Sequence, residues 1–130
     1  ILISNQQLKD RKKQNPSLVL LDVRTQREFQ AGHLKGAAWV ERGIAEFLLA
    51  RTLTDRNVEI IVYCKKGYRA SLVVKALLDI GYINVVAHAG FDEWVLAGNN
   101  YSNYLGESKL VRPKTITAAN FKPNYYLPKH

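Results

Sequence analysis

The feature that most constrains the fold is a repeated alternation of short apolar runs with helix-like segments. Apolar residues fill positions 18–21, 60–63 and 85–87 without interruption. Such runs are typical of strands that are covered on both faces, as in a parallel sheet. Between two of these runs, residues 69–80 place apolar side chains at helical spacing, and Gly81 follows. The sequence therefore predicts an α/β domain, in which ligands gather at the carboxyl ends of the strands.

Two capping boxes predict helix starts. Ser4 is followed three residues later by Gln7, and Thr25 by Glu28. In this motif the two side chains bond reciprocally to the amides that a helix leaves unpaired at its beginning. The expected elements are a short opening strand, helices over 6–14, 25–32, 43–50 and 69–80, and strands over 18–21, 37–40, 59–63 and 85–87.

Composition narrows the class of protein. At 130 residues, 47% hydrophobic and 23% charged, the chain suits one soluble domain, and no apolar run approaches the ~20 residues of a membrane span. One cysteine excludes an intrachain disulfide and a CxxC zinc site. The histidines at positions 33, 88 and 130 lack ligand spacing, so we predict structural roles for them, no metal and no other cofactor.

The net charge and the two ends of the chain limit the partners and cellular locations that need to be considered. A net charge of +8 favours a small anionic ligand or an acidic surface, but the dense basic stripe of a nucleic-acid binder is missing. We expect a monomeric domain over 1–98 and a basic extension over 99–130, with tyrosines that either pack on the domain or form a linker or partner-binding strap. The chain opens without methionine. A cleaved export signal and a longer polypeptide both fit, which leaves the location open between cytoplasm and periplasm.

The only cysteine lies where chemistry is expected. Cys64 follows the strand over 59–63 and precedes the helix over 69–80. Cysteine reacts as the thiolate, which helix N-termini, loop amides and cations stabilise. Lys65, Lys66 and Arg69 supply the cations. A buried, inert cysteine is the common alternative. The charges in the next five residues favour a reactive one.

Several motifs in order resemble those of the single-domain rhodaneses, over residues 1–98. They are Asp22-Val23-Arg24, the stretch 32–37 (Gly-His-Leu-Lys-Gly-Ala), the loop 64–69 and the segment 90–94 (Gly-Phe-Asp-Glu-Trp). The resemblance implies a parallel five-stranded sheet flanked by helices on both faces. It also implies a thiosulfate sulfurtransferase whose Cys64 takes the outer sulfur of a donor, becomes a persulfide, and passes that sulfur to cyanide or another thiophile.

The resemblance makes 64–69 the active-site loop. Lys65 and Lys66 would attract the donor and neutralise its leaving sulfite, Lys66 above all. Gly67 would allow the sharp turn, and Tyr68 completes the loop. Arg69 would face the bound anion or lock the loop through an acid.

Supporting residues are expected at the same edge of the sheet, where the strands end. Asp22 or Glu28 is the acid that Arg69 would pair with. Arg24 would hold Asp22 and the loop, or help to bind the donor. The chain departs from the family at Ala89, where a glycine is usual, and the extra methyl is expected to shift that loop slightly.

Loop length separates two relatives of the fold. Phosphatase relatives have one more residue between cysteine and arginine than the four found here, so sulfur suits this loop better than phosphate. The lysines favour thiosulfate or polysulfide over mercaptopyruvate. Two alternatives stay open: a persulfide carrier or regulatory domain with slow turnover, and a docking module of a larger protein. The sequence does not identify the sulfur acceptor.

Overall fold

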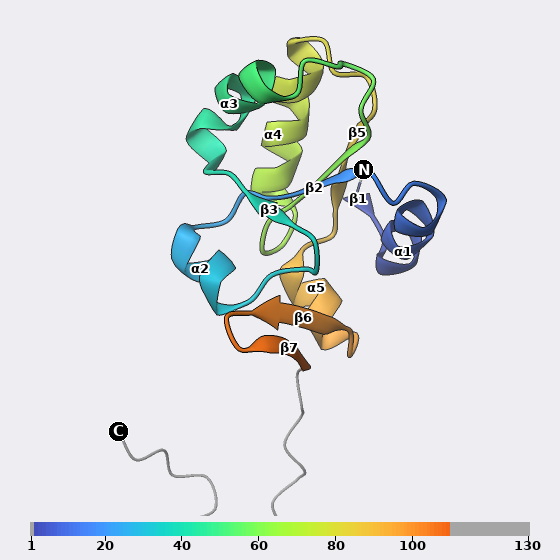
Figure 1. Ribbon diagram of the computed structural model, residues 1–130, viewed down its shortest axis with the longest axis vertical. Helices are drawn as coiled ribbons and strands as arrows, with labels where there is room; N and C mark the ends of the chain where they lie inside the picture. The colour runs from blue at the N-terminus through green and yellow to red at the C-terminus, as the bar shows by residue number, and fades with distance from the viewer. Residues whose placement is uncertain (1, 110–130) are drawn as a thin grey trace, which may run out of the picture.

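A computed structural model describes residues 2–109, and its centre is a five-stranded parallel sheet in the order β1-β5-β4-β2-β3 (Figure 1). The predicted fold class is confirmed. The strands are β1 (Leu2–Ile3), β2 (Val19–Asp22), β3 (Ala38–Trp39), β4 (Ile60–Tyr63) and β5 (Val85–His88), and the helices are α1 (Asn5–Gln14), α2 (Gln26–Ala31), α3 (Ala45–Thr52), α4 (Tyr68–Asp79) and α5 (Phe91–Leu96).

The middle of the sheet places the functional loop. All four residues of β4 are buried, and β4 pairs with β2 and β5. The register sets Asp22 opposite Tyr63, at the ends of their strands. Because parallel strands end at the same edge, the segments that follow β2 and β4 meet there.

Helices cover the two faces of the sheet (Figure 1), and a separate apolar cluster lies on each face. On one face, side chains of α3 and α4 such as Leu49 and Val73 pack with Val62 and Cys64. On the other face, Leu8 of α1 and Trp94 of α5 pack with Ile61. The alternation of strand residues between faces explains why each uninterrupted apolar run feeds both clusters.

The helix expected over 43–50 is divided into two parts in the structure. A 3₁₀ turn over Arg42–Ile44 precedes α3, which ends two residues later than the expected 43–50. Ile44 at the N-cap of α3 has no side-chain oxygen, so no capping bond fixes the helix start. The other predicted helices and strands agree with the structure to within two residues at each end.

The sequence did not indicate α5 or the hairpin that follows it. Strands β6 (Asn100–Asn103) and β7 (Gly106–Lys109) are antiparallel. The backbones of His33 and Ser102 exchange hydrogen bonds of 2.8 and 2.7 Å, and Tyr101 meets Phe91 edge to face, with centroids 5.6 Å apart. This part of the expected extension packs on the domain, although Tyr104 is exposed. Phe121, Tyr125 and Tyr126, the aromatic residues further along the expected extension, lie outside the described residues.

Two further findings concern the described part of the chain. None of its helices has both the length and the apolar character needed to cross a bilayer. Nor do residues 2–109 bring together three side chains suited to holding a metal ion.

His88, at the end of β5, is buried in a neutral form. Its Nε2 lies 2.7 Å from Asn5 Oδ1, and the Gly90 amide donates to its Nδ1 at 3.0 Å. The Asn5 amide nitrogen is used elsewhere, on the Glu93 carbonyl, so Nε2 is the protonated nitrogen. Burial lowers the pKa of His88 to about 4.

This burial predicts a loss of stability in acid. Since the unfolded chain binds a proton near pH 6.5 and the folded chain only near pH 4, stability is complete above pH 6.5 and falls as the pH drops toward 4, by up to about 3 kcal/mol. Urea unfolding at pH 7 and 4.5 measures it. His88→Gln is the control, because it removes this titration and leaves the carboxylates. An equal pH dependence in both proteins would contradict the assignment.

Candidate active site

The sulfur of Cys64 takes the capping position of α4. The residue is 1% exposed, and its Sγ accepts the amide of Gly67 at 3.0 Å and that of Ala70 at 3.4 Å. Gly67, the N-cap of α4, has φ +92 and no side chain to cap the helix. Amide donors and a helix N-terminus favour a thiolate. The predicted juxtaposition of sulfur, loop amides and helix end is therefore present.

Helix α5 holds the other side of the loop. The amide of Phe91 donates to the Cys64 carbonyl at 2.8 Å, and that of Asp92 to the Lys65 carbonyl at 3.2 Å. In a trans peptide the carbonyl and the next amide point in opposite directions. Fixing these carbonyls on α5 therefore turns the amides of Lys65 and Lys66 away from α5.

Gly90 makes this close approach feasible. Its φ is +119, and a Cβ at this position would lie 2.3 Å from the Lys65 carbonyl oxygen and 2.9 Å from the Lys66 amide nitrogen. The preceding Ala89 has no positive φ, and its amide donates to Ile3 O at 3.1 Å. The alanine that departs from the usual glycine therefore adopts backbone angles open to any residue.

The predicted loop cations lie at the surface. Lys65 and Lys66 are exposed, as is Tyr68, at 81%. Arg69 is half-buried, and its Nη2 lies 3.8 Å from Glu28 Oε1. Burial works to raise the pKa of Glu28, but hydrogen bonds from Thr25 and the charge of Arg69 hold it below its usual value. Of the two acids expected for Arg69, the structure selects Glu28.

Asp22 and Arg24 form a buried ion pair, which is the first of the two roles expected for Arg24. Arg24 Nη2 lies 2.7 Å from Asp22 Oδ2, and Arg24 Nε is 3.1 Å from both carboxylate oxygens. The guanidinium also donates to the Gly32 carbonyl and stacks 4.1 Å from the centroid of Phe91. Burial would lower the pKa of Arg24, but its bond to Asp22 and the charge of that residue raise it overall.

Sequence reasoning missed the part that Tyr63 plays beneath this pair. It is fully buried, and its hydroxyl accepts the Leu34 amide at 3.0 Å. Burial, reinforced by the neighbouring Asp22 carboxylate, raises its pKa, so the phenol stays protonated. A tyrosine inside an apolar run was the available signal, since a buried hydroxyl needs a partner.

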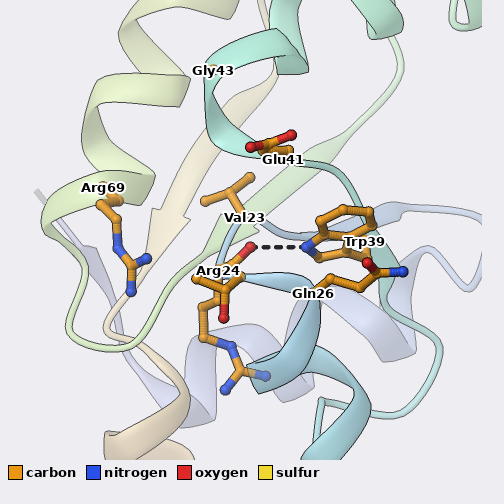
Figure 2. Close-up of a pocket in the computed structure, with 8 residues that line it drawn as sticks. Val23, Arg24, Gln26, Trp39, Glu41, Gly43 and Arg69 are labelled. Atoms are coloured by element: carbon orange, nitrogen blue, oxygen red, sulfur yellow. Dashed lines mark hydrogen bonds between the residues drawn. The ribbon is translucent and has the colours of Figure 1, made fainter.

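A pocket of about 580 Å³ opens at the strand ends, between Arg69 on one side and Trp39 and Glu41 on the other (Figure 2). Trp39 Nε1 donates to the Arg24 carbonyl at 2.8 Å and fixes that wall. Val23 also lines the pocket and belongs to the same apolar cluster as Cys64. The pocket therefore lies on the Cys64 side of the sheet, and the motifs gave no sign of Trp39 or Glu41 as lining residues.

Comparisons with known proteins find similar sequences and similar folds. The thiosulfate sulfurtransferase GlpE of Pseudomonas fluorescens (strain SBW25) is 32% identical over 78 residues, which cover 58% of this chain and 69% of that protein. The solution NMR structure of the rhodanese-like domain of the Anabaena sp. Alr3790 protein is similar, with a TM-score of 0.68 and 21% identity, over 99% of this chain and 94% of that chain.

A human single-domain sulfurtransferase, TSTD1, has a similar fold, with a TM-score of 0.65 and 21% identity over 73% of this chain and 95% of that chain. The model of the rhodanese-like domain family matches residues 4–97, which is well over half of the sequence. The chain therefore belongs to the rhodanese-like domain family.

Proposed function

We propose that the protein is a sulfurtransferase that uses thiosulfate or polysulfide as donor and Cys64 as nucleophile. The observation that carries the proposal is the Cys64 sulfur held by amides at the N-terminus of α4, inside a loop of six residues from Cys64 to Arg69. Such a site stabilises the thiolate and, after the first step, the terminal sulfur of a persulfide.

The reaction takes two displacements. The Cys64 thiolate attacks the outer sulfur of thiosulfate, the sulfur–sulfur bond breaks, and sulfite leaves with the electron pair. The acceptor, cyanide in the assay, then attacks the outer sulfur of the persulfide and departs as thiocyanate, which regenerates the thiolate. Covalent catalysis of this kind divides one difficult transfer into two easier ones.

The loop charges and amides have separate tasks. Lys65 and Lys66 are exposed and attract a dianionic donor. The Lys65 and Lys66 amides, turned away from α5, are the donors that we assign to the outer sulfur. Arg69 lies beside the pocket of Figure 2 and balances the charge of leaving sulfite.

The relatives support this class of chemistry. GlpE of P. fluorescens is named as a thiosulfate sulfurtransferase, and it shares 32% identity with this chain. The four-residue spacing between Cys64 and Arg69, and the lysines within it, favour the same donor.

A persulfide carrier with slow turnover is the second candidate, because Cys64 is 1% exposed. A persulfide protected in this way would persist until an acceptor reaches it. The two candidates differ in rate and share the first displacement, so single-turnover and steady-state measurements separate them.

The direct test is an assay with thiosulfate and cyanide. We expect thiocyanate, a mass gain of one sulfur atom on the protein before cyanide is added, and loss of both in Cys64→Ser. Polysulfide and mercaptopyruvate complete the donor series, with mercaptopyruvate expected to be the poorest. An unmodified mass with every donor would refute the sulfurtransferase, and modification with negligible turnover would favour the carrier.

Gly90→Ala should impair the loop although it leaves every side chain of the loop in place. The new methyl group would stand 2.3 Å from the Lys65 oxygen, so the peptides must move, and a displacement of this size costs about 10²-fold in kcat. The matched control is Gly36→Ala, which also places a side chain at a positive φ (+82) but where a Cβ meets nothing within 4 Å. Circular dichroism checks folding. Equal kcat in the two variants would contradict the role of Gly90.

Lys66→Gln should weaken donor binding. Removing one exposed charge beside a dianion is expected to raise the KM for thiosulfate about three- to tenfold at low salt, and less at high salt. Lys75→Gln, an exposed lysine on α4, is the control for net charge. If both variants shift KM equally, the effect comes from the net charge of the protein and the assignment of Lys66 fails.

A further inference from the structure

We propose that Trp39 and Glu41 form a binding site for a positively charged group, which selects sulfur donors that carry such a group. These two residues, called here the cation site, line the pocket of about 580 Å³ on the side opposite Arg69 (Figure 2). The proposal rests on the sulfurtransferase function above and adds the class of donor. That donor is a zwitterion whose sulfur-bearing anion and ammonium group are joined by a short stem.

The pocket is larger than an inorganic donor needs. Cavities of roughly 300–1,000 Å³ hold organic ligands of drug size. Thiosulfate is a single tetrahedral ion, and it would occupy only the part of the pocket beside Arg69. The part lined by Thr25, Gln26 and Trp39 is left for an organic group that the donor carries.

The two sides of the pocket carry charges of opposite sign. Arg69, in the first turn of α4, is positive, and Glu41, two residues after β3, is negative. Arg69 also faces Glu28 at 3.8 Å, so part of its charge is already balanced. The Glu41 carboxylate opposes a dianion and attracts an ammonium group. Thiosulfate can use only one side of this pocket, whereas a zwitterion fits both.

The side chain of Trp39 offers an aromatic surface and no free hydrogen-bond donor. Its single N–H group donates to the Arg24 carbonyl at 2.8 Å. Trp39 is also the last residue of β3, where it pairs with Asp22 in the sheet. The indole is therefore fixed beside Glu41 (Figure 2). A fixed indole attracts a cation to its ring face and gives an anion no donor, so both residues of the cation site have the same preference.

The cation site lies where a donor can also reach Cys64. Arg69 lines the pocket and ends the reactive loop, and Val23 of the same pocket belongs to the apolar cluster of Cys64. An aminoalkyl thiosulfonate has the required charges. The Cys64 thiolate would attack its outer sulfur, the sulfur–sulfur bond would break, and a sulfinate would leave with the electron pair. The products are the anionic Cys64 persulfide and an aminoalkyl sulfinate, so atoms and charges balance.

Binding is tested without sulfur transfer by two sulfonates of equal size. Taurine carries an ammonium group where 1-propanesulfonate carries a methyl group. In ¹⁵N-labelled protein we expect taurine to shift the indole signal of Trp39 and to bind at least about tenfold more tightly, or about 1.4 kcal/mol. Trp94, whose Nε1 donates to the Asn100 carbonyl and which does not line this pocket, is the internal control. Equal affinities, or equal shifts of both indoles, would overturn the proposal.

Glu41→Gln should change the preference between donors and leave kcat in place. We expect the KM for 2-aminoethanethiosulfonate to rise about tenfold and the KM for thiosulfate to fall about threefold at low salt, because one carboxylate attracts the first donor and opposes the second. The KM for 1-propanethiosulfonate, which has no ammonium group, should not rise.

Glu46→Gln on α3 is the matched control, because it removes the same charge from a residue that does not line this pocket. If Glu41→Gln moves the KM of both charged donors in the same direction, or if Glu46→Gln has the same effects, the cation site is refuted.

Two substitutions at Trp39 isolate the ring face. Trp39→Phe and Trp39→Leu both remove the bond to the Arg24 carbonyl, but only phenylalanine keeps an aromatic face. Among variants that circular dichroism shows to be folded, we expect taurine to bind about two- to fivefold more tightly to Trp39→Phe. The amide signals of Thr25 and Gln26 report this binding. An equal gain for 1-propanesulfonate would assign the effect to apolar contact and contradict the role of Trp39.

The two proposals fail in different ways. If thiosulfate modifies Cys64 but taurine and 1-propanesulfonate bind equally, the cation site fails and the sulfurtransferase function stands. If no donor modifies Cys64, while the wild type prefers taurine and Glu41→Gln does not, the cation site stands and the sulfurtransferase function fails.

Discussion

The buried pair of Asp22 and Arg24 is the interaction on which the arrangement around the loop depends. It joins the end of β2 to the end of α2 through Gly32, and to α5 through the face of Phe91. Losing one partner of such a pair costs about 3–5 kcal/mol, since the other charge stays buried. Because the two charges of this ion pair cancel, the buried carboxylate does not repel an anion that approaches the carboxyl ends of the strands.

The reactive loop lies between the N-termini of two helices and accepts hydrogen bonds from some of the amides that each helix leaves unpaired. The Cys64 sulfur bonds to the first turn of α4, and the carbonyls of Cys64 and Lys65 bond to the first turn of α5. Helix starts leave amides that need acceptors. In this fold the loop supplies them, so the geometry of the sulfur and the stability of both helices have a common origin.

The sequence predicts the parallel sheet and the position of Cys64 because both follow from local pattern. Uninterrupted apolar runs specify covered strands, and Cys64 stands at the end of one. Helix α5 was missed because its six residues span less than two turns, too few for a helical period to show. The sequence did not decide whether Arg69 pairs with Asp22 or with Glu28. The answer depends on which of the two acids Arg24 neutralises, and that follows only from the tertiary structure.

The two faces of the sheet provide different parts of the support for the reactive loop. Cys64 belongs to the cluster on the α4 face, whereas Phe91 and Tyr63 belong to the α5 face. Strand alternation imposes this division, since neighbouring residues point to opposite sides. Gly90 lies where the two faces meet, with no room for a side chain between α5 and the loop. The loop therefore takes its sulfur from one face and the helix that holds its carbonyls from the other, so its geometry depends on the packing of both apolar clusters.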